Sequence, residues 1–335
     1  MLDQLQRPLR DLRISLTDRC NLRCTYCMPK EIFGADHVFL RKDQWLRFQE
    51  LHRIIDALTP LGLAKIRLTG GEPLLRPGLP RFIEGLVRTS SIKDIAITTN
   101  GLRLAERAHE LREAGLHRVT VSLDAIDATI AGKINGLGVP PAAVIAGIDA
   151  AISAGFHLKL NSVIQRGVNE SQIIPLARFA KERAVEIRFI EFMDVGNHNH
   201  WKPEDVVSGA EILQILATEF TLDPLDLSSA TQVAKTHHHR DGGTPLGVIT
   251  SITQPFCSGC TRLRLSADGK LFTCLFATHG FDLREFLRTE TPDDETLRLR
   301  LRQIWSARDD RYSEIRSALQ DKPTDQKVEM SYIGG

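Results

Sequence analysis

The sequence predicts an α/β fold in which helices cover a parallel sheet, as an open doubly wound sheet or an incomplete barrel. Strand-like and helix-like patterns alternate six times between Leu9 and Glu191, as in repeated β-α units. Two missing units argue against a closed eightfold barrel. The alternation stops after Gly196, so we expect a barrel domain over residues 1–200 and an α+β extension over residues 201–335.

The predicted strands are short runs rich in β-branched and other apolar residues, at 12–16, 65–69, 94–98, 118–123, 157–163 and 186–192. Apolar residues recur at helical spacing between them, at 45–58, 82–87, 142–154 and 171–181. The extension is expected to contain helices at 210–220, 282–288 and 295–307 and strands near 232–235 and 246–252. The turn signal Asp268-Gly269 predicts a hairpin between strands at 262–266 and 270–275.

The composition excludes several kinds of protein. The 335 residues are 42% hydrophobic and 25% charged with a net charge of +1, which indicates neither nucleic acid nor a membrane as partner. The sequence shows no apolar leader and no stretch long enough to span a bilayer, so we expect a cytoplasmic protein. A phosphorylated substrate would depend on arginines that the fold gathers locally.

All six cysteines fall into two groups of three. The first triplet is Cys20, Cys24 and Cys27, and the second triplet is Cys257, Cys260 and Cys274. Clustered thiols in a cytosolic chain of this size indicate metal ligands rather than disulfides. Three thiolates are one fewer than a tetrahedral zinc site or a cubane iron–sulfur cluster needs. Each triplet therefore predicts a metal centre with an open position for a cofactor or substrate.

Unusual residues stand at the ends of the predicted strands. They are the first triplet, residues 70–73 (GGEP), residues 98–101 (TTNG), residues 122–124 (SLD), Asn161 and residues 191–194 (EFMD). Active sites of parallel α/β folds lie at the carboxyl ends of the strands, so we expect one active site at this edge.

The C-x3-C-x2-C spacing of the first triplet, with Tyr26 inside it and GGEP after the second strand, resembles the signature of radical S-adenosylmethionine (SAM) enzymes. The resemblance implies an incomplete (βα)6 barrel. It also implies that the first triplet binds three irons of a [4Fe-4S] cluster, whose fourth iron takes the amino and carboxylate groups of SAM. Reductive cleavage of SAM would yield a 5′-deoxyadenosyl radical.

Longer stretches, at 18–24, 121–125, 191–196 and the terminal Gly334-Gly335, are similar to the GTP 3′,8-cyclase family. Its members catalyse the first step of molybdenum cofactor biosynthesis. The resemblance implies conversion of GTP to (8S)-3′,8-cyclo-7,8-dihydroguanosine 5′-triphosphate, by hydrogen abstraction at ribose C3′ and attack on guanine C8. It further implies a separate electron donor, transfer of the product to cyclic pyranopterin monophosphate synthase, and a homodimer.

The same resemblance assigns roles to individual residues. The residues implied to contact SAM are Tyr26, Gly71, Ser122 and Met193. Those implied to contact GTP are Arg13, Arg67, Thr98, Lys159, Arg262 and Arg264. Catalytic roles are implied for Arg262, Arg264, Gly334 and Gly335, the last two as a flexible tail that reaches into the active site.

The second triplet has two interpretations. Together with His279 its spacing matches a structural Cys3His zinc site. Arg262 and Arg264 favour the other interpretation, because alternate residues of a strand face the same way and two guanidiniums suit a polyphosphate. In the cyclase family the open iron of a second [4Fe-4S] cluster binds guanine. We therefore expect the extension to carry a second cluster across the mouth of the barrel.

Some local features stay open at this stage. A two-residue turn at Asp268-Gly269 would place Cys274 opposite Leu263, whereas a bulged three-residue turn would place it opposite Arg264. Residues 237–239, three histidines, are expected in a polar loop rather than at a metal site. The alternatives to a cyclase are a radical SAM peptide maturase with an auxiliary cluster and a non-catalytic iron–sulfur or zinc protein.

Overall fold

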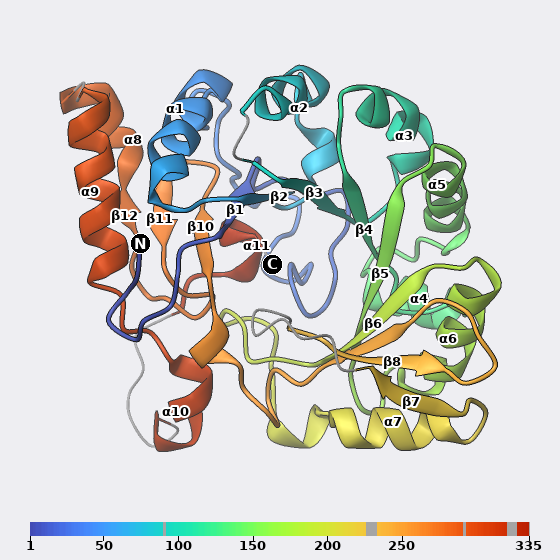
Figure 1. Cartoon of the computed structure of the whole chain (residues 1–335). Coiled ribbons are helices and arrows are strands. Elements are labelled where there is room, and N and C mark those ends of the chain that lie inside the picture. The colour runs from blue at the N-terminus through green and yellow to red at the C-terminus, as the bar shows by residue number, and fades with distance from the viewer. Residues whose placement is uncertain (90–91, 226–232, 291–292, 320–326, 335) are drawn as a thin grey trace.

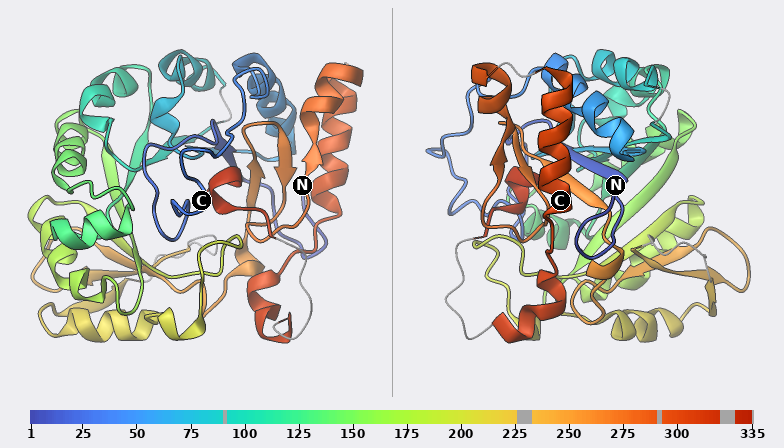
Figure 2. Two further views of the ribbon diagram at one scale, coloured as in Figure 1. Left: turned by 180° about the vertical axis from the view of Figure 1, so that it is seen from behind. Right: turned by 60° about the vertical axis from the view of Figure 1, so that its left-hand side comes forward.

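In the part of the chain that the structure describes, twelve strands form one sheet, which contains strands from both the N-terminal and the C-terminal part of the chain (Figure 1). The structure is a computed structural model and describes every residue except 90–91, 226–232, 291–292, 320–326 and 335. The strand order is β12-β11-β10-β1-β2-β3-β4-β5-β6-β9-β8-β7, so C-terminal segments lie at both edges of the sheet. The sheet is curved, and most helices lie on its outer side (Figure 2).

Residues 11–191 form six parallel strands joined by helices, which confirms the incomplete (βα)6 barrel. The strands are β1 (Asp11–Ser15), β2 (Lys65–Thr69), β3 (Asp94–Thr99), β4 (Arg118–Ser122), β5 (His157–Ile164) and β6 (Glu186–Glu191). Each strand lies within one residue of its predicted bounds. The helices are α1 (Phe48–Leu58), α2 (Leu79–Val87), α3 (Leu104–Glu113), α4 (Ala128–Ile134), α5 (Ala142–Ser153) and α6 (Ile173–Glu182).

The extension continues the same sheet at both edges. Strand β9 (Leu246–Ile249) pairs parallel with β6, and β10 (Arg262–Leu265) pairs parallel with β1. The strands beyond them pair antiparallel and are β7 (Leu222–Leu225), β8 (Lys235–His239), β11 (Lys270–Phe272) and β12 (Phe281–Asp282). The helices are α7 (Gly209–Ala217), α8 (Leu283–Glu285), α9 (Asp294–Ser306), α10 (Tyr312–Leu319) and α11 (Met330–Ile333), with a π-helical turn at Phe286–Glu290. The domain boundary at residue 200 stays a prediction.

No helix in the described part of the chain combines the length and the apolar character needed to cross a membrane. The strands instead separate an apolar outer face from a polar inner face. In β2, Leu68 belongs to the hydrophobic core together with Ile54 and Ile55 of α1, whereas its neighbour Arg67 lines a central cavity. Because successive side chains of a strand point to opposite faces, the same strands build the core and carry charge inside the barrel.

The register of the hairpin differs from both predicted alternatives. Phe272 pairs with Arg264, so Cys274 follows the end of β11 and is opposite neither Leu263 nor Arg264. The hydroxyl of Ser266 accepts a hydrogen bond from the backbone N–H of Lys270 at 2.8 Å and donates to Asp268 at 2.6 Å. This side-chain network closes a turn that the dipeptide signal alone did not specify.

The three histidines at 237–239 lie in strand β8, and the prediction of a polar loop is wrong. Strand β8 pairs with β7 on one side and with β9 on the other, and this tertiary pairing outweighs a weak local signal. The strand predicted near 232–235 therefore begins only at Lys235, and residue 232 lies outside the described residues. Within the described chain, no three His, Cys, Asp or Glu side chains are placed to hold one metal ion.

The carboxylate of Glu191 connects the barrel to the extension. It ends β6, is 0% exposed, and accepts hydrogen bonds from the backbone N–H groups of Gly209, Ile252 and Thr253 at 2.7, 2.8 and 2.9 Å. Gly209 begins α7, and the other two residues follow β9. One buried side chain therefore satisfies backbone groups from two segments of the extension.

Replacing Glu191 with alanine is expected to lower the free energy of unfolding of the apo protein by about 3–5 kcal/mol, because three backbone N–H groups lose their acceptor. Urea denaturation followed by circular dichroism measures the change. The matched control is Glu219→Ala, which removes an exposed carboxylate paired with Arg178 and should leave the free energy of unfolding nearly unchanged. A loss of similar size in both variants would contradict the role assigned to Glu191.

Candidate functional site

A single cavity of about 670 Å³ brings both cysteine triplets together inside the barrel. It is lined by all six cysteines and by ten further residues that the sequence singled out: Arg13, Tyr26, Arg67, Gly71, Thr98, Ser122, Lys159, Met193, Arg262 and Arg264. Every predicted site residue except Gly334 and Gly335 therefore lines this cavity. Gly335 lies outside the described residues.

The two triplets lie at opposite ends of the parallel strands of the barrel. The first triplet follows the carboxyl end of β1. Cys260 precedes β10, which runs parallel to β1, so it lies at the amino-terminal edge. We expected the second triplet to lie across the barrel mouth, but the direction of β10 places it at the opposite end of the barrel. Ligands bound at the two ends would face each other through the barrel.

The loop that carries the first triplet is packed tightly against the turn after β2. The backbone N–H of Gly71 donates to the carbonyl of Thr17 at 2.7 Å, and that of Glu72 donates to the carbonyl of Arg19 at 2.8 Å. A Cβ added to Gly71 would collide with the carbonyl of Arg19. Glycine is needed here because the cysteine loop itself occupies the space of a side chain.

Glu72 orients a neighbour of the first triplet. Its buried carboxylate accepts hydrogen bonds from the hydroxyl of Thr99 at 2.7 Å and from the backbone N–H of Asn100 at 2.8 Å. The side-chain amide of Asn100 then lies 3.8 Å from the sulfur of Cys20, to which it donates. The GGEP motif thus positions a hydrogen-bond donor beside a sulfur ligand through the end of β3.

Burial raises the pKa of the first-triplet thiols. The pKa of Cys20 is raised to about 11 by burial and by Glu72, and that of Cys27 to about 12 mainly by burial. Burial likewise raises the pKa of Cys24 well above its usual range. The free thiols are therefore protonated at neutral pH, and a metal that binds them must displace these protons.

Two polar residues near the first triplet, Asp124 and Asn161, belong to the strand-end residues that the sequence indicated, although no ligand was assigned to them. The hydroxyl of Tyr26 donates to Asp124 at 2.7 Å, and the other oxygen of this carboxylate accepts the backbone N–H of Val163 at 2.8 Å. Burial raises the pKa of Asp124 to about 6. The side-chain oxygen of Asn161, opposite Ser122 in the sheet, is buried without a hydrogen-bond partner among the described residues. This acceptor is available to a bound ligand.

Three arginines lie side by side on neighbouring strands between the two triplets. The register pairs Arg264 of β10 with Arg13 of β1, and Arg13 with Arg67 of β2. Burial and the neighbouring arginines lower the pKa of Arg13 well below its usual range and that of Arg264 to about 10. Such buried like charges are unfavourable unless an anion joins them, so this row fits a polyanionic ligand.

Hydroxyl groups, not a carboxylate, are the hydrogen-bond partners of Arg67. Its guanidinium donates to Thr98 and Thr120, each at 3.1 Å. Burial, together with Arg118 and Arg188, lowers the pKa of Arg67 to about 10. These neutral contacts hold the side chain in place while leaving its charge free for a ligand.

Other cations of the cavity are paired with carboxylates. Arg118 pairs with Asp94, and Glu186 pairs with both Lys159 at 2.6 Å and Arg188 at 2.7 Å. The family resemblance implied a role for Lys159, whereas Arg118 and Arg188 were not predicted as site residues. The available signal was a basic residue near the start of each of three successive strands, which the register then brings onto one wall.

The second triplet lies in a strongly cationic setting. Burial alone would raise the pKa of Cys260, but Arg262 and Arg308 lower it to about 6. The pKa of Cys274 is raised to about 11 by burial and by Asp310. The two thiols therefore differ in their charge at neutral pH although they line the same cavity. A soft metal centre bound here would find one ligand already deprotonated.

The C-terminal tail lies against the arginine row. Arg264 donates a hydrogen bond to the carbonyl of Gly334, whose φ is 75° and whose added Cβ would collide with Thr69. The hydroxyl of Tyr332 donates to Asp268 at 2.5 Å, and the ammonium of Lys327 donates to Asp194 at 2.9 Å. The tail is therefore held at three points, its residues Met330 and Ser331 line the cavity, and Gly334 lies where a residue with a side chain would not fit.

Comparisons with known proteins agree with this geometry. Residues 14–180 match the Radical SAM superfamily, and residues 185–314 match the family Molybdenum Cofactor Synthesis C. Among solved structures, Streptococcus suis SuiB is similar with a TM-score of 0.62 at 17% identity, covering 93% of this chain and 68% of SuiB. This likeness concerns the fold alone.

Relatives of much higher identity cover nearly the whole chain. A GTP 3′,8-cyclase of Staphylococcus haemolyticus is 49% identical, over 99% of this chain and 98% of the relative. A GTP 3′,8-cyclase of Acidothermus cellulolyticus is also 49% identical, with the same coverage of both chains. Together with the two cysteine triplets in one cavity, this identity shows that the chain belongs to the GTP 3′,8-cyclase family of radical SAM enzymes.

Proposed function

We propose that this protein converts GTP to (8S)-3′,8-cyclo-7,8-dihydroguanosine 5′-triphosphate in molybdenum cofactor biosynthesis. The observation that carries the proposal is one cavity with a cysteine triplet at each end of the barrel and a row of buried arginines between the two triplets. A peptide maturase or an electron-transfer protein would leave these arginines without a ligand. A nucleoside triphosphate supplies both the negative charge and a length that reaches along the row.

The first triplet would hold the [4Fe-4S] cluster that is implied by membership of the radical SAM superfamily. The donor set fits, because three thiols with one wall of glycine backbone leave the fourth coordination position open to SAM. When bound, the cluster and SAM supply a 5′-deoxyadenosyl radical for hydrogen abstraction from ribose C3′. Tyr26, Gly71, Ser122 and Met193 would surround SAM, and the unpartnered oxygen of Asn161 offers it a further acceptor.

The second triplet would hold a second [4Fe-4S] cluster whose open position takes the guanine of GTP. All three cysteines line the cavity, whereas His279, the fourth ligand of the zinc alternative, does not. In a tetrahedral zinc site the ligands converge on one ion about 2.3 Å from each sulfur. A cluster instead needs thiols that surround a larger body, and the cavity that the three thiols line has room for one.

The remaining residues would orient GTP between the two ends. Arg13, Arg67 and Arg264 present guanidiniums to the polyphosphate, and Thr98 holds Arg67 in position. Lys159 and Arg262 add further cations on the neighbouring walls. Gly334, whose carbonyl accepts a hydrogen bond from Arg264, would complete the wall beside this arginine. Fixed orientation and exclusion of water matter because a primary carbon radical attacks whichever C–H bond lies closest.

Several partners belong to the same proposal. A separate electron donor would reduce the first cluster, and cyclic pyranopterin monophosphate synthase would take the product. The family resemblance also implies a homodimer.

Removing one cysteine from each triplet is expected to separate the two centres. After anaerobic reconstitution, Cys24→Ala and Cys260→Ala should each lower the iron content from about eight to about four per chain. With dithionite and SAM, Cys24→Ala should form no 5′-deoxyadenosine. Cys260→Ala should still cleave SAM but leave GTP unchanged, because only guanine positioning is lost.

Metal analysis of the wild-type protein provides the control for this pair. Zinc in place of iron at the second triplet would contradict the second cluster while leaving the radical SAM function intact. Full conversion of GTP by Cys260→Ala would contradict guanine binding at that centre.

Replacing Arg67 with alanine is expected to weaken GTP binding roughly 10- to 100-fold, because one buried charge-assisted contact to phosphate is lost. Isothermal titration calorimetry of the reconstituted protein measures the dissociation constant. The loss should shrink as the ionic strength rises.

The matched control is Arg103→Ala, which removes an exposed arginine paired with Glu106 at 3.5 Å and should leave GTP binding unchanged. Cleavage of SAM in the absence of GTP should be the same in both variants. Equal GTP affinity in wild type and Arg67→Ala would refute the placement of the polyphosphate on the arginine row.

A further inference from the structure

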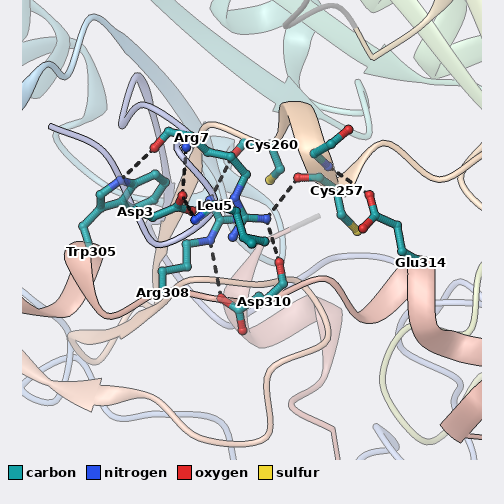
Figure 3. A network of polar contacts seen from close by, with 10 residues as sticks. Asp3, Leu5, Arg7, Cys257, Cys260, Trp305, Arg308, Asp310 and Glu314 are labelled. Carbon is teal, nitrogen blue, oxygen red and sulfur yellow. Dashed lines mark hydrogen bonds and ion pairs between the residues drawn. The ribbon is translucent and has the colours of Figure 1, made fainter.

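The first residues of the chain pack against the Cys257–Cys260 loop of the second triplet, which is about 250 residues away in sequence (Figure 3). The guanidinium of Arg7 is 1% exposed, and its Nη1 donates to the carbonyls of Cys257 at 3.0 Å and of Asp310 at 2.6 Å. The indole N–H of Trp305 donates to the carbonyl of Arg7 at 3.2 Å. The N-terminal segment is thus connected both to a predicted ligand and to the end of α9.

A second arginine holds the other end of the same loop. Nη1 of Arg308 donates to the carbonyl of Cys260 at 2.8 Å. Between the two held carbonyls, the backbone N–H of Ser258 donates to Glu314 at 3.0 Å. Side chains of other segments therefore hold the short 3-10 turn Cys257–Gly259 and the following Cys260 by three hydrogen bonds.

Asp3 joins the two arginines into one unit. Its carboxylate accepts a hydrogen bond from Nε of Arg7 at 2.6 Å and lies 3.5 Å from Nη1 of Arg308, and its side chain is fully buried. It also accepts the backbone N–H groups of Leu5 and Arg7 at 2.9 and 2.8 Å, which fixes the turn of the N-terminal segment. One carboxylate thus orients both guanidiniums. Asp310, the other carboxylate near Arg308, is 27% exposed.

One donor of this unit has no partner among the described residues. Nη2 of Arg7 is buried without a hydrogen-bond acceptor, whereas Nε of Arg308 forms an ion pair with the carboxylate of Asp310 at 3.4 Å. Both arginines line the cavity that contains the second triplet. A buried charged donor without an acceptor is unfavourable, so Nη2 of Arg7 is suited to an anionic group bound against the loop.

We propose that Asp3, Arg7 and Arg308 are positioning residues for the second metal centre, which hold the Cys257–Cys260 loop in its ligand geometry and keep positive charge beneath it. The inference rests on the proposed function, in which the second triplet holds a [4Fe-4S] cluster. The N-terminal segment then positions the metal centre of the second triplet, although the first triplet is closer to it in sequence.

The choice of arginine follows from geometry. Its planar fork donates in several fixed directions at once, so Arg7 can hold two carbonyls while its Nε remains paired with Asp3. The positive charge has a second consequence, because a cluster gains negative charge on reduction. Nearby cations and hydrogen-bond donors therefore raise its reduction potential.

The test compares Arg7→Gln with Arg10→Gln, a matched loss of one arginine from an exposed position of the same segment. After anaerobic reconstitution, iron and sulfide are counted, each cluster is titrated potentiometrically by electron paramagnetic resonance, and SAM binding is measured. We expect Arg10→Gln to match wild type. Arg7→Gln is expected either to fall from about eight to about four irons per chain with SAM binding retained, or to keep both clusters with a more negative potential at the second.

A second variant covers the case in which Arg7→Gln does not fold. Arg7→Lys keeps the buried charge opposite Asp3 but cannot hold both carbonyls with a planar fork. We expect it to fold and bind SAM as wild type does, with faster amide hydrogen exchange at residues 257–260 and an altered signal from the second cluster. Wild-type iron content, potential and exchange in the folded Arg7 variants would overturn the inference.

The wild-type protein separates failure of this inference from failure of the function on which it rests. About four irons per chain in wild type would mean that no second cluster forms, and the proposed function would fail first. Eight irons in wild type with an unaffected second cluster in the variants would leave the function standing and remove only the role of Arg7.

Discussion

The parallel pairing of β10 with β1 is the contact on which the rest of the site depends. It joins a strand from the last quarter of the chain to the first strand of the barrel. Its direction places Cys260 at the amino-terminal edge of the sheet, opposite the loop of the first triplet. Its register sets Arg264 beside Arg13. A parallel neighbour in any other register would separate these guanidiniums or turn them to the outer face.

Burying like charges in a row has an energetic cost, and the surrounding structure limits it in two ways. Arg67 is held by threonine hydroxyls, which satisfy its N–H groups without neutralising the charge. Further along the wall, Glu186 shares its carboxylate between Lys159 and Arg188. The cavity thus contains both uncompensated and compensated cations. Polyphosphate is attracted to the uncompensated cations. Burial of the apolar side chains on the outer face of the barrel offsets the energetic cost of these buried charges.

Much of the barrel could be predicted from the sequence because its signals are local. Short runs rich in β-branched and apolar residues, with helical patterns between them, predicted the six strands to within one residue, and the motif after each strand marked the carboxyl ends of the strands. The cavity is lined by both triplets and by the residues assigned through family resemblance, except the two tail glycines. The hairpin between β10 and β11 was predicted correctly, but its register was not, and the histidines of β8 were predicted in a loop, since pairing partners and the Ser266 side chain decided both. Neither influence is visible in a window of neighbouring residues.

The sequence by itself determined the chemistry of this protein: two sets of three thiols, a glycine-rich turn, and arginines spaced for one face of a strand. Those residue types at those spacings restrict the ligands that can bind. Only the tertiary structure decided where the two sets lie relative to each other, which cations have counter-ions, and that Arg7 lies beneath Cys257. The reason is physical. Spacing along a chain restricts the contacts within one element, whereas contacts between distant segments follow from the direction and register of strand pairing and from the burial of charge.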